Sequence, residues 1–410
     1  MTTASAPEEL APVLRLLRDG SPRTRAELAR ITGVSRSTMA TRIDDLLALG
    51  LARPAGDAAS TGGRPAATFS WAPDARLVAG VDLGATHARV LLADLAVRSL
   101  GQRVVPLCIS EGPQPVLDRV VALVHELLAA AGRGASDLVG VGVGLPGPVD
   151  HATGRPTKPP IMPGWDGADV VGALLPRLGG APVIVDNDVN LMALGEHATA
   201  LPDVGHLLYV KVATGIGSGI IAEGRIHRGA QGSAGDLGHV AVPGGDPEPC
   251  SCGNTGCLEA VAGAGAVARR LTAAGVEART AADVVELVRH GDRRAAAAVR
   301  EAGRAVGAVL AGCVSILNPS AIVIGGSLSG AGEHLMAGIR EVVYARPLPL
   351  ATQHLRVLPS STGPLAGVLG GACAAVDHAL SAPGLFTLRD TPPAPAAAGL
   401  RPEPARPVPA

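Results

Sequence analysis

The chain has 410 residues, 47% of them hydrophobic, and its 35 basic and 36 acidic side chains give a formal net charge of -1. This length and apolar content predict two or three globular domains with substantial cores. The balanced charge excludes a global attraction to nucleic acid or membranes, and an aromatic content of 1% disfavours a surface that stacks single-stranded bases.

The sequence shows neither a secretory signal pattern nor a transmembrane segment. A basic segment followed by an apolar one is missing from its start, and the longest nearly apolar run, residues 305–317, is too short to cross a bilayer. We therefore expect a cytoplasmic protein without a membrane partner.

Residues 1–72 predict a winged helix-turn-helix that binds DNA. Apolar residues recur at helical spacing up to Asp19 and predict a first helix. Thr24 and Ser35 can cap two further helices, with a turn at Gly33 between them. Residues 50–71 predict a two-stranded wing. The polar face of the third helix and the tip of the wing supply the expected DNA contacts, which are Ser35, Arg36, Ser37, Thr38, Thr41, Arg42 and Arg64. Nine arginines against seven acids up to residue 71 give only +2, so a small interaction domain is the alternative.

Two glycine-rich turns follow buried strands and predict a duplicated body. The strand at 77–83 runs into Asp82-Leu83-Gly84-Ala85-Thr86, and the strand at 207–213 runs into Thr214-Gly215-Ile216-Gly217. Backbone N–H groups in such turns bind phosphate, and the carboxylate can organise a hydrated Mg²⁺ ion. One turn of this kind is more often structural, but the pair indicates a phosphate-binding cleft between two lobes.

Polar residues between these turns predict a substrate site. A strand at 138–145 leads into Pro146-Gly147-Pro148, and the proline-rich loop 158–165 forms either a pocket wall or a surface connection. A further strand at 183–185 runs into Asp186, Asn187 and Asp188, and a helix is predicted to follow at 189–197. Asn187 and Asp188 are either helix caps or, in a cleft, an orienting amide and the base that accepts a hydroxyl proton.

The segment 236–259 predicts a structural zinc site. His239, Cys250, Cys252 and Cys257 offer one nitrogen and three sulfurs, a complete tetrahedral ligand set, and turn-forming residues lie between them. Buried or disulfide-bonded cysteines are the alternative, which the close spacing disfavours. Beyond this segment the chain is predicted to be largely helical, and its Ala- and Pro-rich tail from Ser381 is expected to be disordered.

Residues 8–378 resemble the ROK family, named for repressor, open reading frame and kinase. The segments that carry the resemblance are DLGATH, VGVGLPGPVD, PPIMPGWDG, VDNDVNLMALGE, ATGIGSGI, AGDLGHV and CSCGNTGCLE. The resemblance implies an α/β body of the actin-like, ribonuclease-H-like sugar-kinase type behind the DNA-binding head. Its expected parts are the head at 1–72, lobe 1 at 73–200, lobe 2 with the zinc segment at 201–380, and the tail at 381–410.

The resemblance also implies roles for particular residues. Asp188 becomes the catalytic base, and the sugar-binding residues are Gly147, Asn187, Asp188, Asp236, His239 and Glu259. The nucleotide-binding residues are Asp82, Gly84, Thr86, Thr214, Gly215, Gly217, Gly325 and Gly326.

A winged helix is typical of the regulator branch of this family. We therefore expect a sugar-responsive repressor of carbohydrate genes that binds operator DNA as a homodimer or dimer of dimers and contains structural zinc. An ATP- and Mg²⁺-dependent sugar kinase is the alternative. Ala85 and Asp236 stand where kinases of the family carry Gly and Glu.

Overall fold

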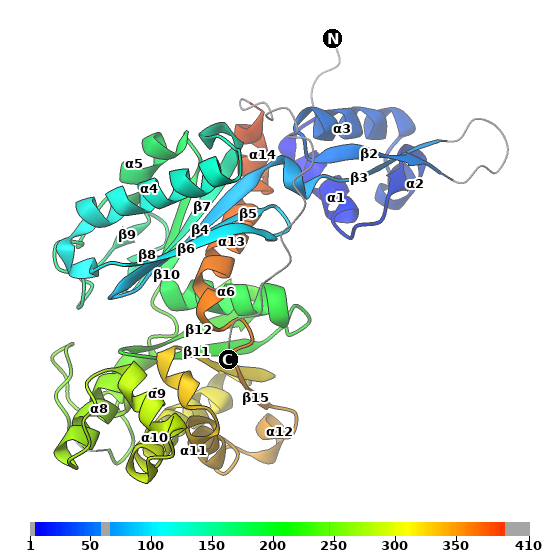
Figure 1. The fold of residues 1–410 in the computed structure, drawn as a ribbon. Coiled ribbons are helices and arrows are strands. Elements are labelled where there is room, and N and C mark those ends of the chain that lie inside the picture. Colours follow the sequence, from blue (N-terminus) through cyan, green and yellow to red (C-terminus); the bar gives the residue numbers. More distant parts are fainter. Residues whose placement is uncertain (1–4, 59–65, 246, 390–410) are drawn as a thin grey trace.

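The computed structural model describes residues 5–58, 66–245 and 247–389, which form a small head and two larger lobes (Figure 1). The head contains three helices and a three-stranded sheet of order β1-β3-β2. The elements of the head are α1 (Pro7–Leu17), β1 (Arg23–Thr24), α2 (Arg25–Thr32), α3 (Arg36–Ala48), β2 (Ala52–Asp57) and β3 (Ala67–Trp71).

Local sequence determines where the helices of the head begin and end. The Thr24 side chain accepts a hydrogen bond from the backbone N–H of Glu27, whose carboxylate accepts one from the backbone N–H of Thr24 in return. Gly33 ends α2 with φ of 72°, a left-handed conformation that suits glycine, and Ser35 caps α3. The predicted helix, turn and helix are therefore present in the head.

The two lobes contain sheets of the same topology. Lobe 1 has the order β10-β7-β4-β5-β6 and lobe 2 the order β13-β12-β11-β14-β15. In each sheet the central strand, β4 or β11, comes first in the chain. It pairs antiparallel with the next strand, β5 or β12, and parallel with a later one, β7 or β14. This repetition confirms the predicted duplication.

The strands of lobe 1 are β4 (Leu77–Leu83), β5 (His87–Asp94), β6 (Ser99–Pro106), β7 (Leu138–Leu145) and β10 (Val183–Asn187), with a separate pair β8 (Val149–Asp150) and β9 (Arg155–Pro156). Those of lobe 2 are β11 (Leu207–Val212), β12 (Ile216–Ala222), β13 (Arg225–His227), β14 (Ala321–Gly325) and β15 (Arg356–Pro359). The helices are α4 (Pro113–Ala130), α5 (Val170–Leu174), α6 (Asp188–Ala200), α7 (Leu258–Ala262), α8 (Ala264–Ala273), α9 (Ala281–Arg289), α10 (Arg293–Leu317), α11 (Glu333–Val343), α12 (Pro349–Thr352), α13 (Ala366–Ala379) and α14 (Ala382–Leu388).

Helices α6 and α13 lie between the two sheets and pack on each other (Figure 1). Helix α6 follows the last strand of lobe 1 and also contacts β11 and β12 of lobe 2, whereas α13 follows lobe 2 and packs against β4 and β7 of lobe 1. Glycines permit the close approach, since a Cβ on Gly370 would lie 1.7 Å from the Leu191 carbonyl oxygen. The expected boundary of lobe 2 at residue 380 is thus wrong for α13, which belongs spatially to lobe 1.

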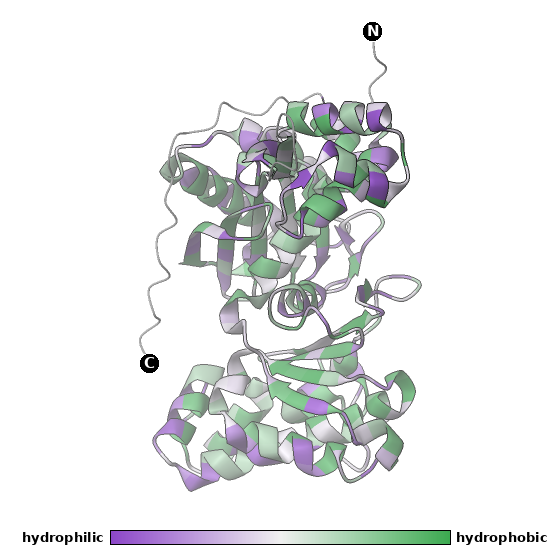
Figure 2. Ribbon diagram, turned by 90° about the vertical axis from the view of Figure 1, so that its right-hand side faces the viewer, coloured by the Kyte–Doolittle hydropathy of each residue, from purple (hydrophilic) through white to green (hydrophobic). Residues whose placement is uncertain are grey.

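Each lobe has its own apolar core, and the head shares one with lobe 1. Leu10, Leu14 and Phe69 of the head belong to the same buried cluster as Ala372 and Val376 of α13. Figure 2 shows hydrophobic residues concentrated on the strands, while the outer helices carry both hydrophobic and hydrophilic residues. The proline-rich loop is also anchored, because the fully buried Trp165 donates a hydrogen bond to the Ile109 carbonyl at 3.0 Å.

The beginning of the predicted tail is ordered. Helix α14 is capped by Ser381 and packs against α1, with Leu385 fully buried. The prediction of disorder from residue 381 is therefore wrong for α14, because contacts with the head stabilise a segment too short to hold a helix alone. Residues 390–410 lie outside the described part of the chain.

Within the described ranges, no single helix has both the length and the apolar character needed to cross a membrane. One sharply bent pair, residues 363–379 followed by α14, meets that test by length and composition only.

Candidate functional site

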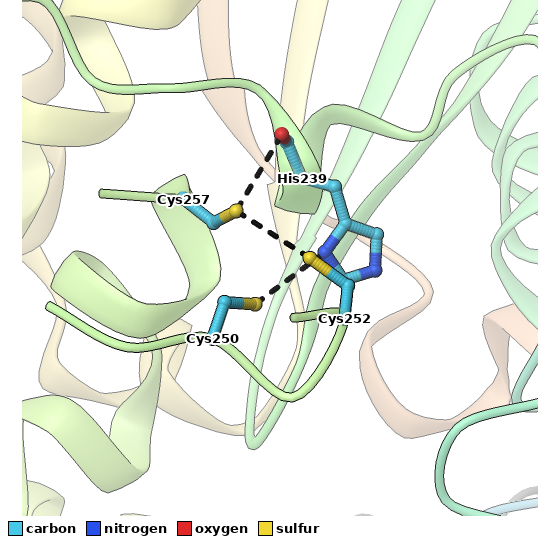
Figure 3. Close-up of side chains that lie close together, drawn as sticks. All are labelled: His239, Cys250, Cys252 and Cys257. Atoms are coloured by element: carbon cyan, nitrogen blue, oxygen red, sulfur yellow. Dashed lines mark hydrogen bonds between the residues drawn. The ribbon is translucent and has the colours of Figure 1, made fainter. Parts of the chain in front are cut away.

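Four predicted metal ligands converge in lobe 2 (Figure 3). The ligand atoms of His239, Cys250, Cys252 and Cys257 lie within 4.8 Å of one another. The Cys252 and Cys257 sulfurs are 3.7 Å apart, close to the separation of about 3.8 Å that two thiolates would have on one tetrahedral zinc ion. All four residues are available as ligands, since the three cysteines are free thiols.

The electrostatic surroundings of the thiols differ. A hydrogen bond from the backbone of Asn254 lowers the pKa of Cys252 to about 7, which favours the thiolate. Burial raises the pKa of Cys257 to about 12, so this deepest thiol needs a cation to ionise at neutral pH. The donor set therefore fits a metal ion that binds thiolate sulfur.

The cluster also positions a carboxylate. Cys257 is the N-cap residue of α7, and Glu259 lies in the first turn of that helix. One Glu259 oxygen accepts a hydrogen bond from the backbone N–H of Ile216 at 3.2 Å, beside Gly215 in the second glycine-rich turn. A metal bound by Cys257 would thus stabilise the helix that holds Glu259 at the mouth of this turn.

His239 presents its two ring nitrogens in different directions. Nδ1 faces the thiols, 3.6 Å from the Cys250 sulfur, and Nε2 points away from them (Figure 3). The segment before His239 is hydrogen-bonded to β12, because the backbone N–H and the hydroxyl of Ser218 each donate to the Gly235 carbonyl at 2.8 Å. Asp236 is exposed beside it.

On the lobe 1 side, Asn187 begins α6 and Asp188 is its first residue. The Asn187 amide oxygen accepts hydrogen bonds from the backbone N–H groups of Val189 and Asn190, so the helix-capping interpretation is correct. Its amide nitrogen also donates to the Gly147 carbonyl at 3.0 Å. Capping therefore fixes Asn187 next to Gly147 and aims the buried Asp188 carboxylate toward lobe 2.

An ion pair joins the two lobes at this point. The Lys211 ammonium on β11 lies 2.5 Å from Asp188 Oδ2, and the Asp188 side chain is only 4% exposed. A second pair lies nearby, where Arg228 Nε donates to Asp186 Oδ2 at 2.7 Å. Neither Lys211 nor Arg228 was expected at a site from the sequence. A lysine inside the otherwise apolar strand LLYVKVA was the available signal.

Asp82, at the first glycine-rich turn, is buried beside the same charges. Burial, reinforced by the negative charge of Asp188, raises the pKa of Asp82 to about 6. Gly367 of α13 covers it so closely that a Cβ there would lie 2.6 Å from the carboxyl carbon. The predicted metal-organising carboxylate thus sits under α13.

The other predicted nucleotide-binding residues divide into two groups. Thr86 and Thr214 are exposed at the two turns, and Gly84 and Gly215 lie next to them. By contrast, a Cβ on Gly217 would lie 3.2 Å from a Val189 methyl of α6, so this glycine faces the helix. A Cβ on Gly325 would meet the Tyr209 hydroxyl at 2.0 Å, and Gly326 turns the chain with φ of 87°.

Most of the predicted DNA contacts form one exposed polar surface on the head. Ser35, Arg36, Ser37 and Thr38 are exposed at the start of α3, and Thr41 is half-buried one turn later. Arg36 makes no ion pair within the described residues. Arg42 differs, because it pairs with Glu9 of α1 at 3.1 Å and its side chain is only 11% exposed. Arg64 lies outside the described residues.

Comparison with known proteins identifies transcriptional repressors and sugar kinases as relatives. The ROK family profile matches residues 78–378. The putative xylose repressor of Caldicellulosiruptor sp. strain Rt8B.4 is 29% identical over 385 residues, which cover 90% of this chain and 96% of the repressor. The crystal structure of a ROK family transcriptional regulator, a homologue of the Escherichia coli MLC protein, superposes with a TM-score of 0.79 at 25% identity and covers 93% of this chain and 98% of its own.

A sugar kinase of the same family matches a smaller share of the chain. The ROK family glucokinase from Streptomyces griseus, solved with glucose and AMPPNP, has a TM-score of 0.64 and 29% identity and covers 73% of this chain and 99% of its own. With a family profile that spans most of the described body and relatives that align along nearly the whole length, the chain belongs to the ROK family.

Proposed function

We propose that the chain is a sugar-responsive DNA-binding transcriptional repressor. The observation that carries this proposal is the extent of similarity, since the repressor relative aligns over 90% of the chain, head included, whereas the glucokinase structure covers 73%. The helices and the antiparallel strands β2 and β3 of the head support this proposal, and α3 would present Ser35, Arg36, Ser37, Thr38 and Thr41 to the major groove. Arg42 would instead stabilise the head through Glu9.

The sugar effector would bind between the lobes. Hydroxyl groups need donors and acceptors fixed by the fold, and Gly147, Asn187, Asp188, His239 and Glu259 provide them from both lobes. Asp236 would join at the exposed rim. Because ligand contacts on both sides favour one lobe arrangement, sugar binding would change the affinity of the head for its operator.

A structural zinc ion would complete this pocket. His239, Cys250, Cys252 and Cys257 form a closed donor set, and the ion would fix the His239 ring so that Nε2 serves a sugar hydroxyl. Zinc would then shape recognition without taking part in a reaction.

The repressor would act as a homodimer on a pseudo-palindromic operator. Lobe 2 offers apolar side chains for self-association, since Ile316, Leu348 and Leu350 are each about four-fifths exposed. Light scattering of the purified protein tests this assembly, and a monomer at micromolar concentration contradicts it.

A gel-shift experiment with the DNA upstream of its own gene tests the repressor. We expect retardation that weakens with salt, and we expect one sugar of a hexose and pentose panel to change it. Arg36→Ala should weaken binding and lower the salt slope by about one, because one phosphate contact is lost. Arg279→Ala, which removes an 82% exposed cation from lobe 2, is the charge-matched control and should bind like the unmodified protein. If the DNA is not retarded at low salt, the proposal is wrong.

The second candidate is an ATP-dependent sugar kinase. It is favoured by Asp188 at the start of α6 and by the glycine-rich turns with exposed Thr86 and Thr214, where Mg²⁺ and ATP phosphates would bind. Coupled ADP release across a hexose panel measures this activity. Activity that is unchanged in Asp188→Asn would exclude Asp188 as the base.

A further inference from the structure

Lys211 is an unusual residue in this chain. Of the 35 basic side chains only two are lysines, Lys158 and Lys211, and the rest are arginines. Lys158 is exposed in the proline-rich loop, whereas Lys211 lies on the central strand of the lobe 2 sheet with its side chain 20% exposed. A half-buried lysine next to a glycine-rich turn needs a partner, and Lys211 has one across the lobe boundary.

That partner is the proposed catalytic base. The Lys211 ammonium donates to Asp188 Oδ2 at 2.5 Å. Within the described residues, the other oxygen, Oδ1, accepts no hydrogen bond from the protein. Asp188 therefore has one oxygen committed to an internal cation and one available to accept a hydrogen bond from a hydroxyl group.

The charges around Lys211 keep it protonated. Burial alone would lower the pKa of Lys211, but Asp188 and Asp82 raise it, and Glu259 adds to their effect, so the net shift is upward. Asp188 is the ion-pair partner of Lys211, whereas Asp82, which also feels the charge of Arg89, and Glu259 act on Lys211 at longer range. In a phosphoryl-transfer site a divalent cation neutralises such carboxylates, and the same cation neutralises the phosphate oxygens.

We propose that Lys211 is a built-in counter-ion that takes the place of the divalent cation in this pocket, so that the protein binds its sugar without Mg²⁺ and nucleotide and leaves it unphosphorylated. The inference rests on the proposed sugar pocket and specifies which of the two candidate functions the pocket serves. The ammonium beside Asp188 repels an incoming Mg²⁺ and already engages Oδ2 of that carboxylate. Asp188 Oδ1 still recognises a sugar hydroxyl.

Manganese binding, followed by the electron paramagnetic resonance of free Mn²⁺, tests the inference on the zinc-loaded full-length protein. We expect no binding tighter than about 1 mM in the unmodified protein, and at least tenfold tighter binding in Lys211→Met, where the Asp188 carboxylate loses its ion-pair partner. Lys158→Met, the other lysine of the chain, is the matched control and should bind like the unmodified protein. Lys211→Gln provides a second, polar replacement.

Two outcomes overturn the inference. One is tight Mn²⁺ binding by the unmodified protein, which requires no variant to fold, and the other is a Lys211→Met or Lys211→Gln protein that binds no more tightly than the control. Thermal denaturation with Mg²⁺ and AMPPNP gives an independent reading, because the unmodified protein should not be stabilised by them. These measurements do not involve DNA, so a failed gel shift and a failed counter-ion are told apart.

Discussion

Replacing Asp82 by asparagine should stabilise the protein at neutral pH. Asp82 is buried at the end of β4 under α13, and this environment raises its pKa from 3.8 to about 6. In the folded state the carboxyl group holds its proton more tightly than in the unfolded chain. The folded state therefore loses stability as the pH rises from about 4 to about 6. Above that range the full cost of the buried, ionised carboxylate applies.

The size of this penalty follows from the shift. Each pKa unit corresponds to about 1.4 kcal/mol, so the change at Asp82 amounts to about 3 kcal/mol at pH 7.5. Asparagine has nearly the same shape and carries no charge at any pH. We expect Asp82→Asn to raise the midpoint of thermal unfolding by about 5 °C at pH 7.5, and the gain should vanish near pH 4.

Thermal unfolding of both proteins between pH 4 and 8 measures the effect. Asp150→Asn is a control of opposite sign, because hydrogen bonds from the Thr153 hydroxyl and from backbone N–H groups lower the pKa of Asp150. That variant should lose stability, and the loss should shrink as the pH falls. If Asp82→Asn is less stable than the unmodified protein at pH 7.5, then Lys211 compensates the Asp82 charge fully and the reasoning is refuted.

Three further changes probe other parts of the structure. Cys257→Ser should abolish the binding of one zinc per chain, measured by elemental analysis, whereas Cys108→Ser, outside the cluster, should retain it. Glu196→Ala should reduce the free energy of unfolding by about 4 kcal/mol in urea, because it strands four donors of residues 360–362, and a loss no greater than that of the exposed Glu286→Ala would contradict this. Leu385→Ala should release α14 from the head at a cost of about 3 kcal/mol, seen as faster hydrogen exchange in α1 and α14, and unchanged exchange would disprove the contact.

Many strands of the two lobes were predictable because their signals are local. The apolar run before Pro146 became β7 (Leu138–Leu145), and both hairpins fell at the expected turns. Ser35 and Asn187 occupy cap positions that their residue type favours. The Cys/His cluster could also be predicted, because three of its four ligands lie within eight residues of one another.

What failed depended on contacts between distant segments. Sequence order placed α13 in lobe 2, since nothing local reveals that a helix crosses to the other sheet. Gly217 has the spacing of a phosphate-binding glycine, yet its missing side chain makes room for Val189. The short helix α14 is held by the head, so its composition alone suggested disorder. Lys211 gained its importance only when the fold placed it against Asp188.

Helix α13 has a mechanical consequence. Its first turn covers Asp82 through Gly367, and its last turn enters the core shared with the head through Val376 and Ala379. Its 14 residues make a rigid rod of about 21 Å. A tilt of about 5° at the pocket end would carry the other end through about 2 Å, a displacement comparable to the helix shifts that switch subunit interfaces. Asp82 and the core of the head thus lie at opposite ends of one rigid helix, so a tilt at either end is transmitted to the other.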